Sequence, residues 1–153
     1  MKNPLEIFLF KGCGSPLCQE SYEFLLERLP GIGRELSPYL KKAWNGEINI
    51  VVSDGTTIRT MNEQFRGVDS ATDVLAFPLE EDILGEVWIC PGIIETNAKK
   101  YGRPYDEELI RVLVHGVLHL VGYDHTASFT GSTSEKKEEM FEIQENIVDA
   151  VLS

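Results

Sequence analysis

Apolar residues recur along this chain with two spacings, one typical of strands and one typical of helices. Four short segments are rich in Ile, Val, Leu and Phe and are bounded by turn-forming residues, which predicts strands at 5–10, 47–53, 72–77 and 84–90. Between the first two strands, residues 17–29 and about 35–44 place apolar side chains at helical spacing. Pro30 and Gly31 are expected to separate these two helices, because both residues interrupt helical structure.

A short amphipathic helix is predicted after the second strand. Ile58, Met61 and Phe65 fall on one face and form its apolar stripe. Gly67 can close this helix in the left-handed conformation, which places Arg66 at the helix end.

Three longer helices are predicted after the fourth strand. They begin at Pro91, near Asp106 and near Ser132, where a Ser-x-x-Glu capping box would reach Glu135. The chain has pairs of helices near its start and near its end, with adjacent strands between them. This order favours an α+β fold over strict β-α-β alternation. The chain has 153 residues and is 42% hydrophobic, enough to fill one core. We therefore expect one domain over residues 1–153, with a small mixed four-stranded sheet packed against several helices.

The helix predicted at about 106–121 is apolar around most of its circumference. Its narrow polar strip carries Glu108, Arg111, His115 and His119. The two histidines lie one turn apart on the same face, with Cβ atoms roughly 5 to 6 Å apart, so both imidazoles can reach one ion.

All three histidines of the chain fall within residues 115–125. Gly122 can end the helix, after which the chain can turn back and bring His125 to the same point. Three imidazoles leave the fourth tetrahedral position open, as in catalytic zinc sites. The pattern predicts a metal site on a buried helix and the turn after it. Asp124 either orients an imidazole or stabilises this turn.

A similar histidine spacing occurs in metzincin proteases, where H-E-x-x-H-x-x-G-x-x-H supplies a glutamate base directly after the first histidine. Here that position is Gly116, which cannot accept a proton. A metallopeptidase-like hydrolase would need another carboxylate, with Glu108 as the candidate. A second alternative is a non-catalytic assembly factor whose metal only anchors the turn after Gly122.

The formal net charge of -11 disfavours sequence-independent adhesion to nucleic acid, which needs many basic side chains. A local phosphate-binding patch remains compatible with this charge. Lys99, Lys100 and Arg103 either form such a patch or are solvated charges at a helix end.

The three cysteines are an odd number, and the N-terminus carries no export signal. We therefore expect reduced thiols in a cytoplasmic protein. No apolar stretch is long enough to span a membrane. Cys90 and Trp88 are expected in the core, and Cys13 and Cys18 are not expected to bind metal.

Three stretches of the chain carry longer patterns. HGVLHLVGYDH (115–125) matches H-G-x-L-H-L-x-G-Y-D-H at every specified position. MNEQFRGVDSATDVLAFP (61–78) is similar to L-N-x-x-(Y/F)-R-G-x-x-x-x-T-D-V-L-S-F-P, and LGEVWIC (84–90) is similar to L-G-D-(I/L)-x-I-C. In these motifs the chain resembles the YbeY family of bacterial endoribonucleases, also called rRNA maturation factors. Met61, Ala76 and Glu86 replace the leucine, serine and aspartate of the family pattern.

The resemblance implies a metal-dependent endoribonuclease that prefers single strands and acts on 16S ribosomal RNA in small-subunit maturation and quality control. It also implies that His115, His119 and His125 bind one divalent ion, generally zinc, and that small-subunit ribosomal proteins are candidate partners. Arg66 would be the functional arginine, because a guanidinium can hold phosphate oxygens; its alternative role is that of a solvated cation at a helix end. Two chemical routes stay open, attack by activated water or polarisation of a phosphoryl oxygen.

Overall fold

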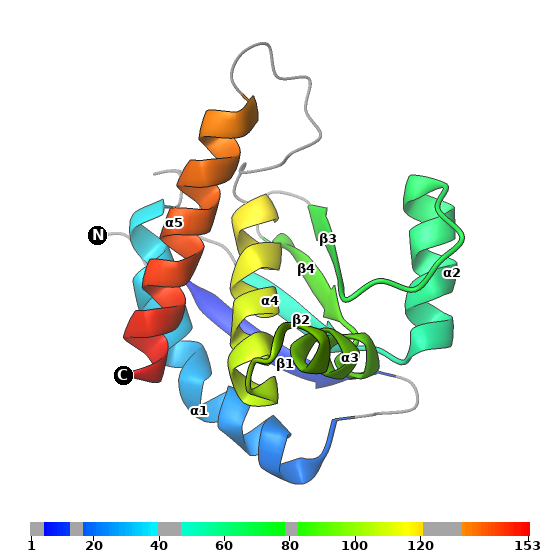
Figure 1. The fold of residues 1–153 in the computed structure, drawn as a ribbon, viewed down its shortest axis with the longest axis horizontal. Coiled ribbons are helices and arrows are strands. Elements are labelled where there is room, and N and C mark those ends of the chain that lie inside the picture. Colours follow the sequence, from blue (N-terminus) through cyan, green and yellow to red (C-terminus); the bar gives the residue numbers. More distant parts are fainter. Residues whose placement is uncertain (1–4, 13–16, 40–46, 79–82, 121–132) are drawn as a thin grey trace.

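A computed structural model of the chain shows one open sheet of four strands covered by helices (Figure 1). It describes residues 5–12, 17–39, 47–78, 83–120 and 133–153. The predicted α+β class is confirmed. His125 and Ser132 lie outside the described residues, so the third predicted ligand and the predicted capping box are not described.

The sheet is mixed, with the order β1-β2-β4-β3. The strands are β1 (Glu6–Lys11), β2 (Glu47–Val52), β3 (Val74–Pro78) and β4 (Ile83–Ile89). Strands β1, β2 and β4 run parallel, whereas β3 is an antiparallel edge strand beside β4. All four strands lie within two residues of the predicted positions.

Helices pack on both faces of this sheet, but on one face they leave Phe8 and Phe10 of β1 exposed. They are α1 (Gln19–Leu36), α2 (Gly55–Arg66), α3 (Pro91–Tyr101), α4 (Tyr105–Leu120) and α5 (Thr133–Leu152), with a 3-10 turn at Ser37–Tyr39. Glycines in the left-handed conformation end α2 and α3: Gly67, with φ 70°, as predicted, and Gly102, with φ 66°. None of the described helices is long and apolar enough to cross a membrane.

The predicted break at Pro30 and Gly31 is wrong, because α1 runs through both residues. A proline inside a helix costs about 3 kcal/mol. The buried stripe of α1, which includes Leu25, Leu29 and Ile32, outweighs this cost, since burial of each such side chain contributes about 1.5 to 3 kcal/mol. The second predicted helix, at about 35–44, is therefore the end of α1 followed by the 3-10 turn, and residues 40–44 are not described.

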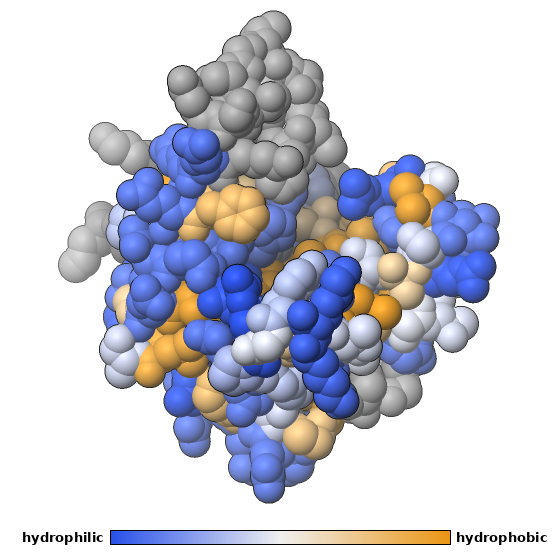
Figure 2. Space-filling model, in the orientation of Figure 1, coloured by the Kyte–Doolittle hydropathy of each residue, from blue (hydrophilic) through white to orange (hydrophobic). Residues whose placement is uncertain are grey.

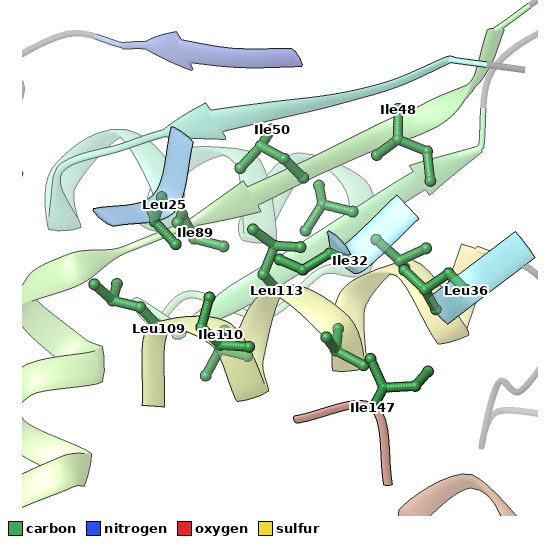
Figure 3. Close-up of a cluster of buried hydrophobic side chains, with 14 of the residues drawn as sticks. Leu25, Ile32, Leu36, Ile48, Ile50, Ile89, Leu109, Ile110, Leu113 and Ile147 are labelled. Atoms are coloured by element: carbon green, nitrogen blue, oxygen red, sulfur yellow. The ribbon is translucent and has the colours of Figure 1, made fainter. Parts of the chain in front are cut away.

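The main hydrophobic core lies between one face of the sheet and helices α1, α4 and α5 (Figure 3). Ile50 and Ile89 point from the sheet toward Leu109 and Leu113 of α4, and Ile48 lies on the side of Leu36 of α1 (Figure 3). A smaller cluster, centred on the buried side chains of Ile58, Leu75 and Cys90, joins α2 to β3 and to the end of β4. Helices α4 and α2 are thus held by two separate clusters.

Helix α4 lies unusually close to the sheet at Gly116. A Cβ atom at this position would lie 2.6 Å from Cγ1 of Val87 and 3.0 Å from Cγ2 of Val74. At Gly85 of β4, a Cβ atom would lie 2.6 Å from the backbone oxygen of Phe77 and 2.7 Å from Cδ2 of Leu120 in α4. Glycine at 116 therefore serves packing, which accounts for its presence where a metzincin has its glutamate.

Replacing Gly116 with alanine should lower the unfolding free energy by about 1 to 3 kcal/mol, because the added methyl overpacks the contact with Val87. Gly92→Ala is the matched control, since Gly92 lies in the first turn of α3 and a Cβ there meets nothing within 4 Å. Without a clash, helix propensity makes glycine to alanine neutral or stabilising by up to about 1 kcal/mol. Chemical denaturation measures both variants, and equal stability changes would contradict the packing role of Gly116.

Candidate functional site

The polar strip of α4 is present as predicted. Arg111, His115 and His119 are half-buried, and the residues between them along the helix are buried. Nε2 of His115 and Nε2 of His119 are 3.0 Å apart, and their ring centroids are 4.6 Å apart. The two imidazoles therefore converge on one point.

This separation can be compared with the requirement of a shared metal ion. Two nitrogens bound to a tetrahedral zinc at about 2.05 Å lie about 3.3 Å apart. The observed 3.0 Å is within a few tenths of an ångström of that value, so the pair fits a divalent ion with only small ring movement. Within the described part of the chain no group of three metal-binding side chains is found, and the third predicted ligand, His125, lies outside it.

The two histidines open onto a pocket of about 620 Å³. Edge strand β3 crosses this pocket, with α4 on one side of it and the end of α2 on the other (Figure 1). Figure 2 shows hydrophobic surface in the recess between the α2 lobe and the rest of the molecule. The lining also includes a carboxylate, that of Asp73, whose Oδ1 accepts a hydrogen bond of 3.3 Å from Oγ1 of Thr72.

Arg66 lies at the last position of α2, is exposed, and lines the same pocket as the two histidines. Two local features fix the helix that carries it. Asp54 accepts a hydrogen bond of 2.7 Å from the backbone N–H of Thr57, which caps the first turn and lowers the pKa of Asp54. Gly67 then ends the helix directly after Arg66.

Phe65 is a lining residue that the sequence pattern assigned to an apolar stripe. Ile58 is buried and Met61 is half-buried, as that stripe predicts, but Phe65 is 62% exposed. Its ring lies 4.7 Å from the ring of Phe77, with a tilt of 56°. The last apolar position of the stripe therefore lies beside strand β3 and lines the pocket instead of the core.

Below the histidines, α4 and α5 are joined by a network of charged side chains. Arg111 donates to the carboxylates of Glu108 and Glu145, and Arg103 also donates to Glu108 at 3.2 Å. These contacts lower the pKa of Glu145 and raise the pKa of Arg111. Glu108 is buried, is held by two arginines and is not part of the pocket lining, which removes the carboxylate that the peptidase alternative needed.

The same network reaches the first histidine through Gln144 of α5. Oε1 of this buried amide lies 2.7 Å from Nδ1 of His115, and its Nε2 donates to Glu145 at 3.0 Å. Sequence reasoning missed Gln144, which is 29 residues from His115 in the chain. In the sequence, the only feature that pointed to Gln144 was the position of a polar residue beside the apolar Ile143 in the last predicted helix.

The remaining candidates lie away from the pocket. Lys99 pairs with Glu95 at 3.2 Å on the surface of α3, and Lys100 lies over the ring of Tyr101. Cys90 is buried, as predicted, and its burial raises the pKa of the thiol. Trp88 is half-buried and packs against the smaller cluster.

These features define a class of protein: an α+β domain in which a histidine pair and an arginine on separate helices share one pocket beside an edge strand. Comparison with known proteins identifies the family. The family model described as Endoribonuclease YbeY matches residues 23–152. The chain belongs to this family.

Similar proteins cover most of the chain. A protein of Thermotoga neapolitana named Endoribonuclease YbeY is 41% identical over 126 residues, which are 82% of this chain and 81% of that protein. Its namesake from Thermotoga maritima is 43% identical over 112 residues, 72% of this chain and 71% of the relative. A solution structure of a Thermotoga maritima protein is 38% identical, with a TM-score of 0.57 over 96% of this chain and 88% of that one.

Replacing Arg111 with methionine should lower the unfolding free energy by about 3 kcal/mol, because the buried carboxylate of Glu108 loses its closest counter-charge. This value is at the lower end of the range for breaking a buried ion pair, since Arg103 still contacts Glu108. Adding Glu108→Leu to this variant should recover much of the loss, because no unpaired buried charge remains. Urea denaturation measures the series, and an additive second loss would contradict the pairing argument.

Proposed function

We propose that this chain is a single-domain, metal-dependent endoribonuclease over residues 1–153 that cleaves single-stranded segments of ribosomal RNA. The observation that carries this proposal is the convergence of the His115–His119 pair and Arg66 on one pocket. Membership of the YbeY family supports RNA as the substrate and hydrolysis of a phosphodiester bond as the reaction. We propose 16S ribosomal RNA in small-subunit maturation as the target, with small-subunit ribosomal proteins as partners.

The proposed ligands of the metal ion are His115, His119 and His125. All three are neutral nitrogen donors, a set that suits zinc. A zinc ion held in this way acts as a Lewis acid, which can activate water near neutral pH or polarise a phosphoryl oxygen. Helix α4 supplies two of these ligands from a rigid, buried element, so their spacing is set before any ion binds.

Arg66 is proposed to hold the scissile phosphate. A guanidinium can donate two parallel hydrogen bonds to phosphate oxygens and offset the charge that develops in the transition state. Its exposure leaves these donors accessible from the pocket, and the capped end of α2 fixes its position.

The exposed ring of Phe65 supports a single-stranded substrate. It lies next to Arg66 in sequence and lines the same pocket, so a base beside the bound phosphate can stack on it. Stacking on an aromatic side chain requires an unpaired base and contributes about 1 to 3 kcal/mol per base. A duplex keeps its bases inside the helix and cannot use this contact.

Arg66→Ala should reduce kcat/KM for RNA cleavage by about 100- to 1000-fold, the usual effect of removing one hydrogen-bond donor to the transition state. The bound metal should stay at the wild-type level, since Arg66 is not among the proposed ligands. Arg59→Ala is the matched control, because Arg59 is an exposed arginine of the same helix that pairs with Asp69 at 2.7 Å and lies outside the pocket. Equal cleavage by wild type and Arg66→Ala at equal metal content would show that Arg66 has no role in the reaction.

Removing the metal with a chelator should abolish cleavage while far-UV circular dichroism stays unchanged, and added zinc should restore cleavage. The large apolar core and the ion pairs of Arg111 hold α4 in place without an ion. The assembly-factor alternative predicts that chelation melts the domain, since a structural metal contributes folding free energy directly. Elemental analysis of wild type and His119→Ala shows whether the histidine pair holds the ion.

A further inference from the structure

We infer that Gln144 is a positioning residue that holds His115 in the tautomer with Nδ1 protonated and the lone pair of Nε2 directed toward the pocket. The inference deepens the proposed function, because it names a residue outside the ligand set that prepares one ligand for the metal. It follows from the order of donors and acceptors along four side chains of α4 and α5.

The first step is the anchoring of Glu145. Arg111 donates to this carboxylate through Nε, at 2.9 Å to Oε2, and through Nη2, at 2.9 Å to Oε1. The same contacts lower the pKa of Glu145, so its side chain remains an ionised, acceptor-only carboxylate at neutral pH.

The second step is the orientation of the Gln144 amide. This side chain is 3% exposed, and one end of its amide lies 3.0 Å from Oε2 of Glu145. A carboxylate oxygen can only accept a hydrogen bond, so the NH2 end of the amide must face Glu145. The carbonyl oxygen, Oε1, is therefore the end that faces His115.

The third step is the protonation of His115. Oε1 of Gln144 lies 2.7 Å from Nδ1 of His115 and can only accept, so Nδ1 carries the hydrogen. In a neutral imidazole the other nitrogen, Nε2, then carries the lone pair. Nε2 is the nitrogen that lies 3.0 Å from His119, at the point where the two rings converge.

This arrangement removes a cost of metal binding. An imidazole free to adopt either tautomer must be held in one of them when it binds an ion, and partners that fix the tautomer typically change metal affinity by 10- to 100-fold. Arg111 and Glu145 thus act on His115 through a single neutral amide.

The test uses the metal-free full-length chain labelled with 15N at histidine. Long-range 1H–15N correlation spectra report which ring nitrogen carries the hydrogen, and competition with a chromophoric chelator gives the zinc affinity. Gln144→Leu removes the acceptor, and Gln144→Glu keeps an acceptor toward Nδ1. Asn146→Leu is the matched control, because Asn146 is an exposed amide on the same helix.

We expect the Nδ1-protonated form of His115 in the wild type, in Asn146→Leu and in Gln144→Glu. In Gln144→Leu the His115 signals should move toward a tautomer mixture, and the zinc affinity should fall by about 10- to 100-fold. The inference is overturned if wild-type His115 carries its hydrogen on Nε2, or if Gln144→Leu keeps both the Nδ1-protonated form and the wild-type affinity. If Gln144→Leu does not fold, the wild-type and Gln144→Glu spectra still decide the outcome.

Failure of the proposed function would look different from failure of this inference. A wild-type chain that binds zinc with the expected tautomer but does not cleave RNA would contradict the nuclease proposal alone. A chain that cleaves RNA with the opposite His115 tautomer would contradict only the role of Gln144.

Discussion

The close contact between α4 and the sheet at Gly116 is the constraint on which the site depends. Without a Cβ atom at 116, the helix can lie against Val87 and Val74, and this contact fixes the depth of the residues on either side of it. His115 precedes Gly116, and His119 follows one turn later toward the edge strand. A larger residue at 116 would lift this turn of the helix and move both imidazoles. The packing requirement therefore also leaves no room at this position for the glutamate base of a metzincin.

The two helices that form opposite walls of the pocket are held by different hydrophobic clusters. Helix α4 belongs to the main core, whereas α2 is attached to β3 and β4 through the cluster centred on Ile58. Strand β3 is the common element, because it contacts α4 and also packs on α2. The distance between Arg66 and the histidines is thus set by an edge strand that is paired on one side only. The proposed roles of Arg66 and the histidines depend on this spacing, because catalytic groups must be held within narrow tolerances.

Local signals in the sequence were enough to predict the strands, the left-handed glycine end of α2 and the polar strip of α4, because each depends on residues close together in the chain. Predictions failed where tertiary packing overrode the local signal. Pro30 lies inside α1 because burial of the helix stripe outweighs the lost hydrogen bond, and Phe65 lines the pocket beside Phe77 instead of entering the core. The partners that α5 supplies to Arg111 and His115, Glu145 and Gln144, could not be predicted, since they depend on how α5 is placed against α4.

The charge balance of the site explains how a chain of net charge -11 can act on RNA. In the network below the histidines, Arg103 and Arg111 pair with Glu107, Glu108 and Glu145, so the two arginines offset most of the negative charge of this cluster. Among the described lining residues, the positive charge of Arg66 equals the negative charge of Asp73, so their formal charges sum to zero. Three neutral imidazoles would add no negative charge, so the two positive charges of a bound ion would be left for an anionic ligand to neutralise. A phosphate group supplies that charge at the site of reaction, which removes the need for a broad basic surface and favours contacts at one phosphodiester over general adhesion to nucleic acid.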